Sequence, residues 1–332
     1  MTKILTVVVP SYNAADYLLQ TIPTMTKVAN SKDIEILIIN DGSTDNTLWT
    51  AKELEEKYPG VVYVIDKENG GHGSAINSGI KHARGKYFKV IDADDWVDSN
   101  NFNDLISFLS VTDVDEIVSP YNDVWEDTRK INKVDYFGDS KLEPMKSYDY
   151  KVLLEDIGIL PRMHSITIKT SLLQENNIKI DENMFYVDTE YIVYPTPFIK
   201  TIAYTSEAIY QYRRGFVSQS TSLKNYIKNR EMVKQVSLSL IDFYNSFSLT
   251  DITDDLVKDT IKRSVTIAST LCFHLADSQK GKHELIEYDE MLKQSNSIFY
   301  HERQGLKSLL MKISKYRLFG TVAYFVKKRP KL

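Results

Sequence analysis

The sequence contains very little cysteine. Its 332 residues include a single cysteine, Cys272, which excludes an internal disulfide and a zinc cluster built from cysteines. Because Cys272 lies between Leu271 and Phe273, we expect it to be a small buried apolar group. Such a sequence is typical of a reducing compartment, and we expect a cytoplasmic protein.

Long apolar runs are missing as well. No segment has the roughly 20 consecutive apolar residues that a helix needs to cross a bilayer. The apolar run at 7–9 follows one lysine and is too short for the core of a secretory signal, so we expect it to be a buried strand. Peripheral attachment to the inner face of the plasma membrane stays open.

The chain also lacks an excess of positive charge. Its 45 Asp and Glu residues outnumber 41 Lys and Arg residues, and the formal net charge is −4. Surfaces that bind nucleic acid are basic, so nucleic acid is excluded as the main partner. The hydrophobic fraction of 42% and the charged fraction of 26% are ordinary for a folded protein, and the length allows one large domain with a smaller appendage.

What the sequence does contain is a strict alternation of strand and helix patterns. Continuous apolar runs predict buried strands at 4–9, 34–39, 61–65 and 87–91. Helical spacing of apolar residues predicts helices at 14–28, 47–58 and 74–83. This order is typical of an α/β fold with a mostly parallel sheet flanked by helices, in which ligands bind at the carboxyl ends of the strands.

Three carboxylates, Asp92, Asp94 and Asp95, follow the fourth predicted strand. Side chains at alternate positions of an extended chain face the same side, so Asp92 and Asp94 are placed to face one hard cation, which would neutralise a diphosphate. Acidic turns after strands are also common as solvated caps. The residues at the other strand ends are therefore needed to distinguish a cation site from a solvated cap.

Four strand-end segments together resemble the family 2 glycosyltransferases of the GT-A fold. They are Val-Val-Val-Pro-Ser-Tyr-Asn at 7–13, Ile-Ile-Asn-Asp-Gly-Ser-Thr-Asp at 38–45, Asn-Gly-Gly-His-Gly-Ser-Ala-Ile-Asn-Ser-Gly-Ile at 69–80 and Ala-Arg-Gly-Lys-Tyr-Phe-Lys-Val-Ile-Asp-Ala-Asp-Asp-Trp at 83–96. The resemblance implies a GT-A domain at 1–220, with a nucleotide-binding half at 1–100 and an acceptor half at 101–220. A helical region at 221–332 would follow.

The resemblance also implies a site for a nucleotide sugar, with uridine as the expected nucleoside. The family uses the positions of Tyr12 and Asp41 to cover the base and to accept its N–H; the alternative is that Tyr12 packs on Pro10 and Asp41 caps a helix. The donor-binding residues that the resemblance implies are Pro10, Tyr12, Asn13, Asp41, Gly71, His72, Asn77, Asp92, Asp95, Arg213 and Arg214.

Metal and base positions follow from the same resemblance. The Asp-x-Asp motif implies Mg²⁺ or Mn²⁺ held by Asp94 and Asp92. An inverting transfer needs a general base, which the family takes from a Glu-Asp pair. Here Val187 replaces the first acidic residue, so Asp188 is the expected base and Glu190 its competitor. A helix N-cap is the alternative role for Asp188.

The implied activity is the transfer of one sugar from a nucleotide sugar, expected to be UDP-linked, to a glycan or lipid-linked acceptor in bacterial surface polysaccharide synthesis. The Gln-x-x-Arg-Trp motif of processive synthases is absent, which favours single addition. Two alternatives stay open. One is a catalytically silent sugar-nucleotide-binding or scaffold protein, and the other is a sugar nucleotidyltransferase.

Helical patterns dominate the rest of the chain, at 223–247, 254–276 and 306–328. The last of these sets apolar residues against lysines and arginines. It predicts either a basic amphipathic helix on an anionic membrane surface or an ordinary helix packed on the domain or in a homodimer.

Overall fold

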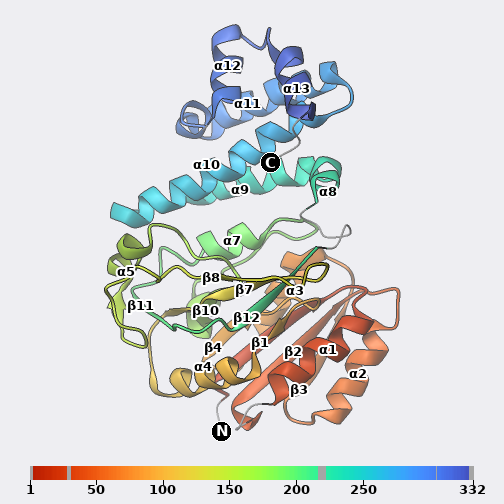
Figure 1. Ribbon diagram of the computed structural model, residues 1–332, viewed down its shortest axis with the longest axis vertical. Coiled ribbons are helices and arrows are strands. Elements are labelled where there is room, and N and C mark those ends of the chain that lie inside the picture. The colour runs from red at the N-terminus through yellow and green to blue at the C-terminus, as the bar shows by residue number, and fades with distance from the viewer. Residues whose placement is uncertain (1–2, 28–30, 216–221, 304, 329–332) are drawn as a thin grey trace. The chain divides into compact units, whose positions relative to one another are not determined.

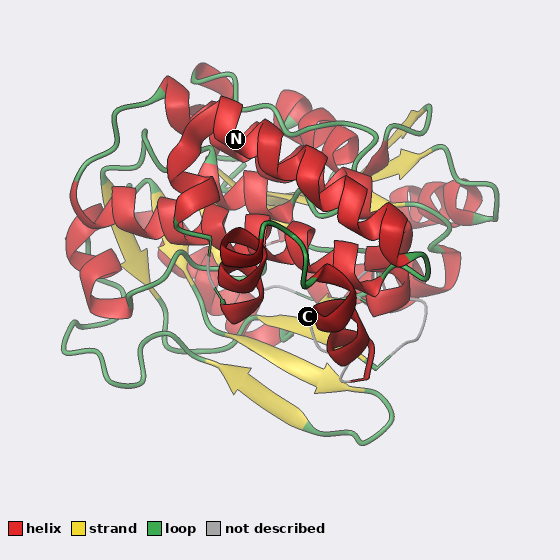
Figure 2. Cartoon of the chain, turned by 90° about the horizontal axis from the view of Figure 1, so that it is seen from above, coloured by secondary structure: helices red, strands yellow, loops and turns green. Residues whose placement is uncertain are grey.

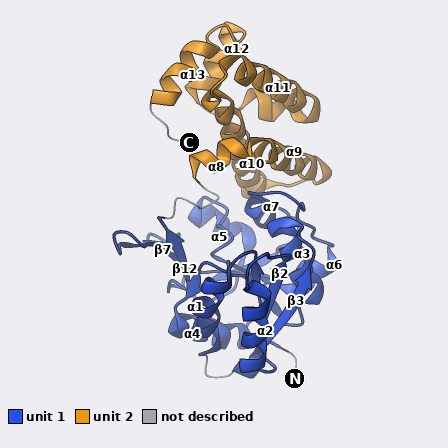
Figure 3. Ribbon diagram, turned by 90° about the vertical axis from the view of Figure 1, so that its right-hand side faces the viewer, with its two compact units in different colours: residues 1–215 blue, residues 216–332 orange. Residues whose placement is uncertain are grey.

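The computed structural model describes residues 3–27, 31–215, 222–303 and 305–328. The chain divides into two compact units, residues 1–215 and 216–332 (Figure 3). Every strand that the structure describes lies in the first unit, and the regular elements described in the second unit are all helices. Figure 2 shows the helices and strands in different colours. Among the described residues, no helix has the length and apolar character needed to span a membrane.

An eight-stranded sheet forms the centre of the first unit (Figure 1). Its order is β3-β2-β1-β4-β10-β6-β11-β9, and the first four of these strands are parallel to one another. The strands are β1 (Leu5–Ser11), β2 (Ile34–Asp41), β3 (Val62–Lys67), β4 (Tyr87–Val90), β6 (Glu116–Val118), β9 (Tyr148–Asp149), β10 (Ile166–Lys169) and β11 (Thr201–Tyr204). The predicted α/β fold and its four leading strands are confirmed.

A second, four-stranded sheet has the order β5-β12-β7-β8. Its strands are β5 (Trp96–Val97), β7 (Tyr121–Trp125), β8 (Ile131–Val134) and β12 (Tyr210–Arg214). In it Tyr210 pairs with Val97 on one side and with Tyr121 on the other. This pairing places β12 beside β5, which directly follows the acidic turn after β4.

Helices cover both faces of the central sheet because successive side chains of β1 point to opposite sides. Leu5, Val7 and Val9 share one hydrophobic core with side chains of α1, α2 and α4. Val8 faces α3, where a Cβ added to Gly79 would lie 2.4 Å from the Val8 side chain. The helices of the first unit are α1 (Ala15–Thr26), η1 (Ser31–Asp33), α2 (Thr47–Lys57), α3 (Gly71–His82), α4 (Ser99–Val111), α5 (Tyr150–Ile157), α6 (Thr170–Glu175) and α7 (Asp188–Val193).

The second unit is built from α8 (Leu223–Lys228), α9 (Arg230–Ser246), α10 (Asp251–His274), α11 (Ser278–His301), α12 (Leu306–Ser314) and α13 (Phe319–Lys328). The continuous helix expected at 306–328 is wrong. Lys315 and Tyr316 have φ angles of 49° and 60°, in the left-handed region that ends a helix. The segment is therefore two short helices. The helix expected at 223–247 is likewise divided, at Asn229.

Candidate active site

The expected site residues lie on segments that meet where β1, β2 and β4 end. Parallel pairing places Ser11 of β1 beside Asn40 of β2, so the loops after these two strands begin at the same edge of the sheet. β4 pairs with β1 on its other side, and Asp92 follows β4 closely. The amino ends of α3 and α7 complete the group, as the contacts below show.

Asp41, at the end of β2, organises the glycine-rich turn. Its buried carboxylate accepts hydrogen bonds from Gly70 N (2.9 Å), Gly71 N (2.7 Å) and Lys67 Nζ (2.7 Å). These bonds fix the first turn of α3, which begins at Gly71 rather than at residue 74 as expected. A carboxylate has about four acceptor sites. The three hydrogen bonds occupy three of these sites, and Asp41 is 3% exposed.

The loop after β1 presents Tyr12 to solvent. Asn13 adopts φ 51°, donates its backbone N–H to Ser43 Oγ (3.0 Å) and accepts the backbone N–H of Thr44 at its side-chain oxygen (2.8 Å). Pro10 is buried within β1. Tyr12 is 53% exposed, and an exposed aromatic side chain can stack on a planar ligand.

His72, in the first turn of α3, is joined to Asp92 by a hydrogen bond of 2.8 Å between Nε2 and Oδ1. Burial disfavours the charged imidazole, but the bond to Asp92 and the nearby carboxylates outweigh it and raise the pKa of His72. Burial likewise disfavours the Asp92 carboxylate, but the bond from His72 outweighs it and lowers the pKa of Asp92. The pair connects α3 to the acidic turn after β4.

The other two aspartates of the turn have different surroundings. Asp95 is 1% exposed, and its oxygens accept hydrogen bonds from Tyr210 OH (2.5 Å) and Arg213 N (2.7 Å). Burial, then the charges of Asp94 and Asp92, raise the pKa of Asp95 well above its ordinary value. Burial and the charge of Asp92 raise the pKa of Asp94 to about 6. In the described part of the chain, no side chain hydrogen-bonds to the Asp94 carboxylate.

His164 adds a possible metal ligand that the sequence did not reveal. One ligand atom each from Asp92, Asp95 and His164 lie within 4.8 Å of one another. Both ring nitrogens of His164 are buried and lack a hydrogen-bond partner among the described residues. Burial lowers the pKa of His164 to about 4, so the ring is neutral and able to act as a ligand. Both oxygens of Asp92 and both oxygens of Asp95 already take part in hydrogen bonds, whereas no side chain among the described residues bonds to the Asp94 carboxylate.

Asp188 is the first residue of α7 and keeps contact with solvent. The charge of Asp188 contributes to the raised pKa of His72, and the charge of Asp92 contributes to the raised pKa of Asp188. Surrounding protein atoms replace part of the water around its carboxyl and raise the pKa of Asp188, while His72 acts in the opposite direction. The N-cap position of α7 belongs to Val187. An accessible carboxylate of raised basicity suits a general base.

Glu190, the competing residue, points elsewhere. It is fully buried, and its Oε2 accepts the backbone N–H of Asp181 at 2.8 Å. Burial raises the pKa of Glu190 to about 8. Its contacts hold the segment before α7 in place, and its burial keeps it from an acceptor in this structure.

The same segment is attached to α3. The Asn77 side chain donates to Ile180 O (2.8 Å) and accepts from Ile180 N (2.9 Å). A Cβ on Gly73 would lie 2.1 Å from Asp181 O, so only glycine allows this approach. At Gly71 a Cβ would lie 3.4 Å from Asn183, an ordinary contact, and it is the φ of 82° that favours glycine there. In this structure these residues join α3 to the segment that carries Asp188.

The two arginines of β12 are both paired with carboxylates. Arg213 is buried, bonds to Glu126 (2.5 Å) and donates Nε–H to Asp94 O (2.6 Å). Its guanidinium lies 4.7 Å from the Trp96 ring centroid. Arg214 bonds to Asp123 (2.9 Å). Arg213 thus fixes the backbone of the acidic turn through its bond to Asp94 O.

Sequence reasoning also missed Tyr210, whose hydroxyl donates to the carboxylates of both Asp95 and Asp92. Tyr210 stands in an alternating pattern at 208–213, which is typical of a strand but does not reveal the neighbours of that strand. His164 stands in no recognisable motif.

Comparisons with known proteins agree with this architecture. The sequence pattern described as Glycosyl transferase family 2 matches residues 6–172, just over half of the chain. The minor teichoic acid biosynthesis protein GgaB of Bacillus subtilis is 29% identical over 180 residues, which make up 53% of this chain and 19% of GgaB. The chain spans half or less of the length of the first curated relatives that it matches.

Two further relatives extend over nearly the whole chain. The uncharacterized glycosyltransferase EpsJ of Bacillus subtilis is 23% identical over 99% of this chain and 97% of its own length. The crystal structure of residues 1–349 of S. aureus TarS superposes with a TM-score of 0.70 at 16% identity, covering 99% of this chain and 92% of that one. TarS has also been solved with UDP and with UDP-GlcNAc. This likeness shows the GT-A fold, and the chain belongs to glycosyl transferase family 2.

Proposed function

We propose that the protein is a metal-dependent, inverting glycosyltransferase that moves one sugar from a UDP-linked donor to a glycan or lipid-linked acceptor during bacterial surface polysaccharide synthesis. One observation carries the proposal. Asp41 holds the first turn of α3, which carries His72, and His72 bonds to Asp92. The charges of His72 and Asp92 both influence the pKa of Asp188, the first residue of α7. The proposal therefore assigns Asp41, the acidic turn at Asp92 and the accessible carboxylate of Asp188 to one site.

The donor assignment is supported by the first two strand ends. The exposed Tyr12 can stack on a base, and Asp41 is proposed to accept a base N–H, such as the N3–H of uracil. TarS, which shares the fold, binds UDP-GlcNAc. GgaB, a relative in sequence, is named for teichoic acid biosynthesis. Both support a UDP-sugar and a surface polymer.

The residues present fit a divalent cation. Asp94 has a carboxylate without a side-chain partner among the described residues, Asp92 is kept ionised by His72, and His164 contributes two unpaired nitrogens nearby. Oxygen ligands suit Mg²⁺ and Mn²⁺, and an imidazole is better tolerated by Mn²⁺. When bound, the cation would neutralise charge on the diphosphate leaving group. Asp92 and Asp94 are the ligands that we propose.

Asp188 supplies the proton transfer in this proposal. Its carboxylate removes the proton of the acceptor hydroxyl while that oxygen attacks the anomeric carbon and the bond to UDP breaks. Attack from the face opposite UDP inverts the configuration at that carbon. Glu190 supports the step indirectly, because it fixes the backbone of Asp181 and hence the start of α7.

The test is a donor screen with the purified full chain. Each of several UDP-sugars and GDP-mannose is incubated with an extract of lipid-linked acceptor, with Mn²⁺, with Mg²⁺ or with EDTA. We expect release of UDP from one UDP-sugar, dependent on the metal, and a product whose anomeric configuration by NMR is inverted. Donor binding without any release would favour a silent binding protein. Pyrophosphate release from UTP and a sugar phosphate would favour a nucleotidyltransferase.

A further inference from the structure

The last thirty residues of the chain are strongly basic although the protein as a whole is acidic. From Arg303 to Leu332 the sequence holds nine Lys and Arg residues and no Asp or Glu. Six of these cations lie on or beside α12 and α13 within the described range: Lys307, Lys312, Lys315, Arg317, Lys327 and Lys328. In the part of the chain that the structure describes, none of the six pairs with a carboxylate. The segment therefore carries uncompensated positive charge.

The same segment exposes an unusual amount of apolar surface. Of the seventeen large apolar side chains that are exposed among the described residues, six lie within 306–325: Leu306, Leu309, Ile313, Leu318, Tyr324 and Phe325. The three on α12 follow the spacing i, i+3, i+7 and so form one stripe. Ile313 is 72% exposed, although a globular helix normally buries such a stripe. We call these six residues and the six cations the α12–α13 surface.

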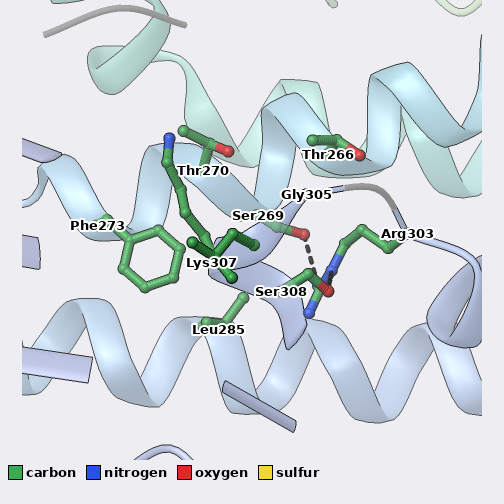
Figure 4. Close-up of a pocket in the computed structure, with 10 residues that line it drawn as sticks. Thr266, Ser269, Thr270, Phe273, Leu285, Arg303, Gly305, Lys307 and Ser308 are labelled. Atoms are coloured by element: carbon green, nitrogen blue, oxygen red, sulfur yellow. Dashed lines mark hydrogen bonds between the residues drawn. The ribbon is translucent and has the colours of Figure 1, made fainter. Parts of the chain in front are cut away.

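This exposure does not arise from a loose tail, because α12 is held at both ends. The buried carboxylate of Asp289, on α11, accepts hydrogen bonds from Arg303, just before α12, and from Tyr316 (2.6 Å), just after it. Arg303 also bonds to Ser308 and Ser269, beside a cavity of about 320 Å³ (Figure 4). The opposite face of α12 is buried through Met311.

The second helix is fixed in the same way. Phe319 of α13 stacks on Phe273 of α10 with 4.8 Å between ring centroids. Val322, Ala323 and Val326 are buried in the same cluster. Since both helices already bury one apolar face, their exposed leucine, isoleucine and aromatic side chains form a second face that is left for another partner.

We propose that the α12–α13 surface docks the protein on an anionic lipid bilayer, with the two helices lying in the interface. Aromatic and aliphatic side chains beside lysines are the composition that enters the headgroup boundary of such membranes. Self-association is disfavoured because a symmetric contact of this surface would bring like charges together, with no acidic residue from 303 to 332 to pair with them. This inference does not depend on the proposed catalytic residues.

Sedimentation of the full chain with lipid vesicles tests the proposal. We expect binding to vesicles of phosphatidylglycerol and phosphatidylcholine, weaker binding at high salt, and little binding to phosphatidylcholine alone. Each cation removed should lower the partition coefficient roughly fivefold, the change that corresponds to about 1 kcal/mol per Lys or Arg near an anionic surface. The partition coefficient of the variant Lys315→Glu/Arg317→Glu should therefore be lower than that of the parent by about 25-fold or more.

One matched control and one further variant separate the effect of the surface from general effects. Lys52→Glu/Lys81→Glu changes net charge equally at exposed positions of the first unit and should bind almost as the parent does. Leu309→Gln/Ile313→Gln keeps the charge and should also reduce binding. Equal melting temperatures and equal UDP release without vesicles will show that the variants are folded.

Three results would overturn the proposal. One is equal vesicle binding by the parent and the Lys315→Glu/Arg317→Glu variant. Another is an equal loss of binding in the Lys52→Glu/Lys81→Glu control. The third is a parent dimer in light scattering that becomes a monomer in Leu309→Gln/Ile313→Gln, which would assign the surface to a second copy of the chain. Because UDP release is measured separately, failure here leaves the catalytic proposal standing.

Discussion

Two partly buried carboxylates, one in each unit, have opposite surroundings. In the second unit, Glu284 accepts hydrogen bonds from Arg230 (2.7 Å) and Lys234 (3.2 Å), and the bond from Arg230 is the main cause that lowers the pKa of Glu284 to about 2. In the first unit, Asp94 lies beside two more aspartates, and burial together with Asp92 raises its pKa to about 6.

This difference distinguishes carboxylates that stabilise the fold from carboxylates that belong to the candidate active site. Each buried carboxylate of the second unit that we describe is matched by cations of the same chain, so its contacts stabilise the helices. The acidic turn gathers like charges that Arg213 and His72 only partly offset. Such clusters persist in proteins where a ligand of opposite charge completes them. The predictions below test this distinction, beginning with the largest expected effect.

Replacing Asp94 with alanine should lower transfer about a thousandfold or more, because the leaving diphosphate loses the metal that shields its charge. UDP release with saturating donor and Mn²⁺ measures the effect. Since a like charge is removed, the melting temperature should stay the same or rise. Activity that survives both EDTA and this substitution would contradict the metal assignment, and loss of folding would contradict the comparison between units.

Replacing Asp289 with alanine should destabilise the protein by about 3 to 5 kcal/mol, because Arg303 is left as a buried cation without its partner. Urea unfolding followed by circular dichroism measures this change. The double variant Asp289→Leu/Arg303→Met should recover most of the loss, since no uncompensated charge remains. A large drop in the turnover number of the folded Asp289→Ala protein would show that the second unit takes part in catalysis.

The substitution Asp188→Asn should reduce turnover by roughly a hundredfold, the usual contribution of a general base, while donor affinity by calorimetry stays nearly the same. Asn keeps the size of the side chain but cannot accept the proton. The matched variant Glu190→Gln should reduce turnover less. If only Glu190→Gln stops turnover while both variants bind donor normally, the base is Glu190.

The smallest effect concerns Glu116, a buried carboxyl of β6 outside the site. Burial raises its pKa to about 8 from the ordinary value of 4.5, and Oε1 has no hydrogen-bond partner among the described residues. Between these pH values the folded state holds a proton that the unfolded state releases, so this group lowers stability as pH rises. Below pH 4.5 both states are protonated and the effect vanishes.

The variant Glu116→Gln removes this dependence. It should be more stable than the parent by about 1 to 3 kcal/mol at pH 8 and equal to it near pH 4, as measured by urea unfolding at several pH values. Turnover should not change, because Glu116 is not among the residues that bond to the acidic turn in the described part of the chain. A gain in stability that is the same at every pH would contradict the assigned pKa.

Local sequence patterns determined the leading half of the fold. Continuous apolar runs identified β1 to β4, and the residues that end them, such as Asp41 and Asp92, could be assigned to one edge because parallel strands share an orientation. These inferences need only neighbouring residues. They therefore held without knowledge of the tertiary contacts.

Tertiary structure alone decided which groups accompany the acidic turn. Tyr210 lies 118 residues from Asp92 in the sequence, yet its hydroxyl bonds to the Asp92 carboxylate. Glu190 and Asp188 are acidic residues of the same short segment, so the sequence does not distinguish them. Packing in the folded protein buries Glu190 and leaves Asp188 accessible. Hydrophobic spacing likewise could not reveal the left-handed turn at Lys315, where the contact of Tyr316 with Asp289 holds the chain. Burial and long-range hydrogen bonds depend on which elements pack together, and periodicity within one segment carries no record of that.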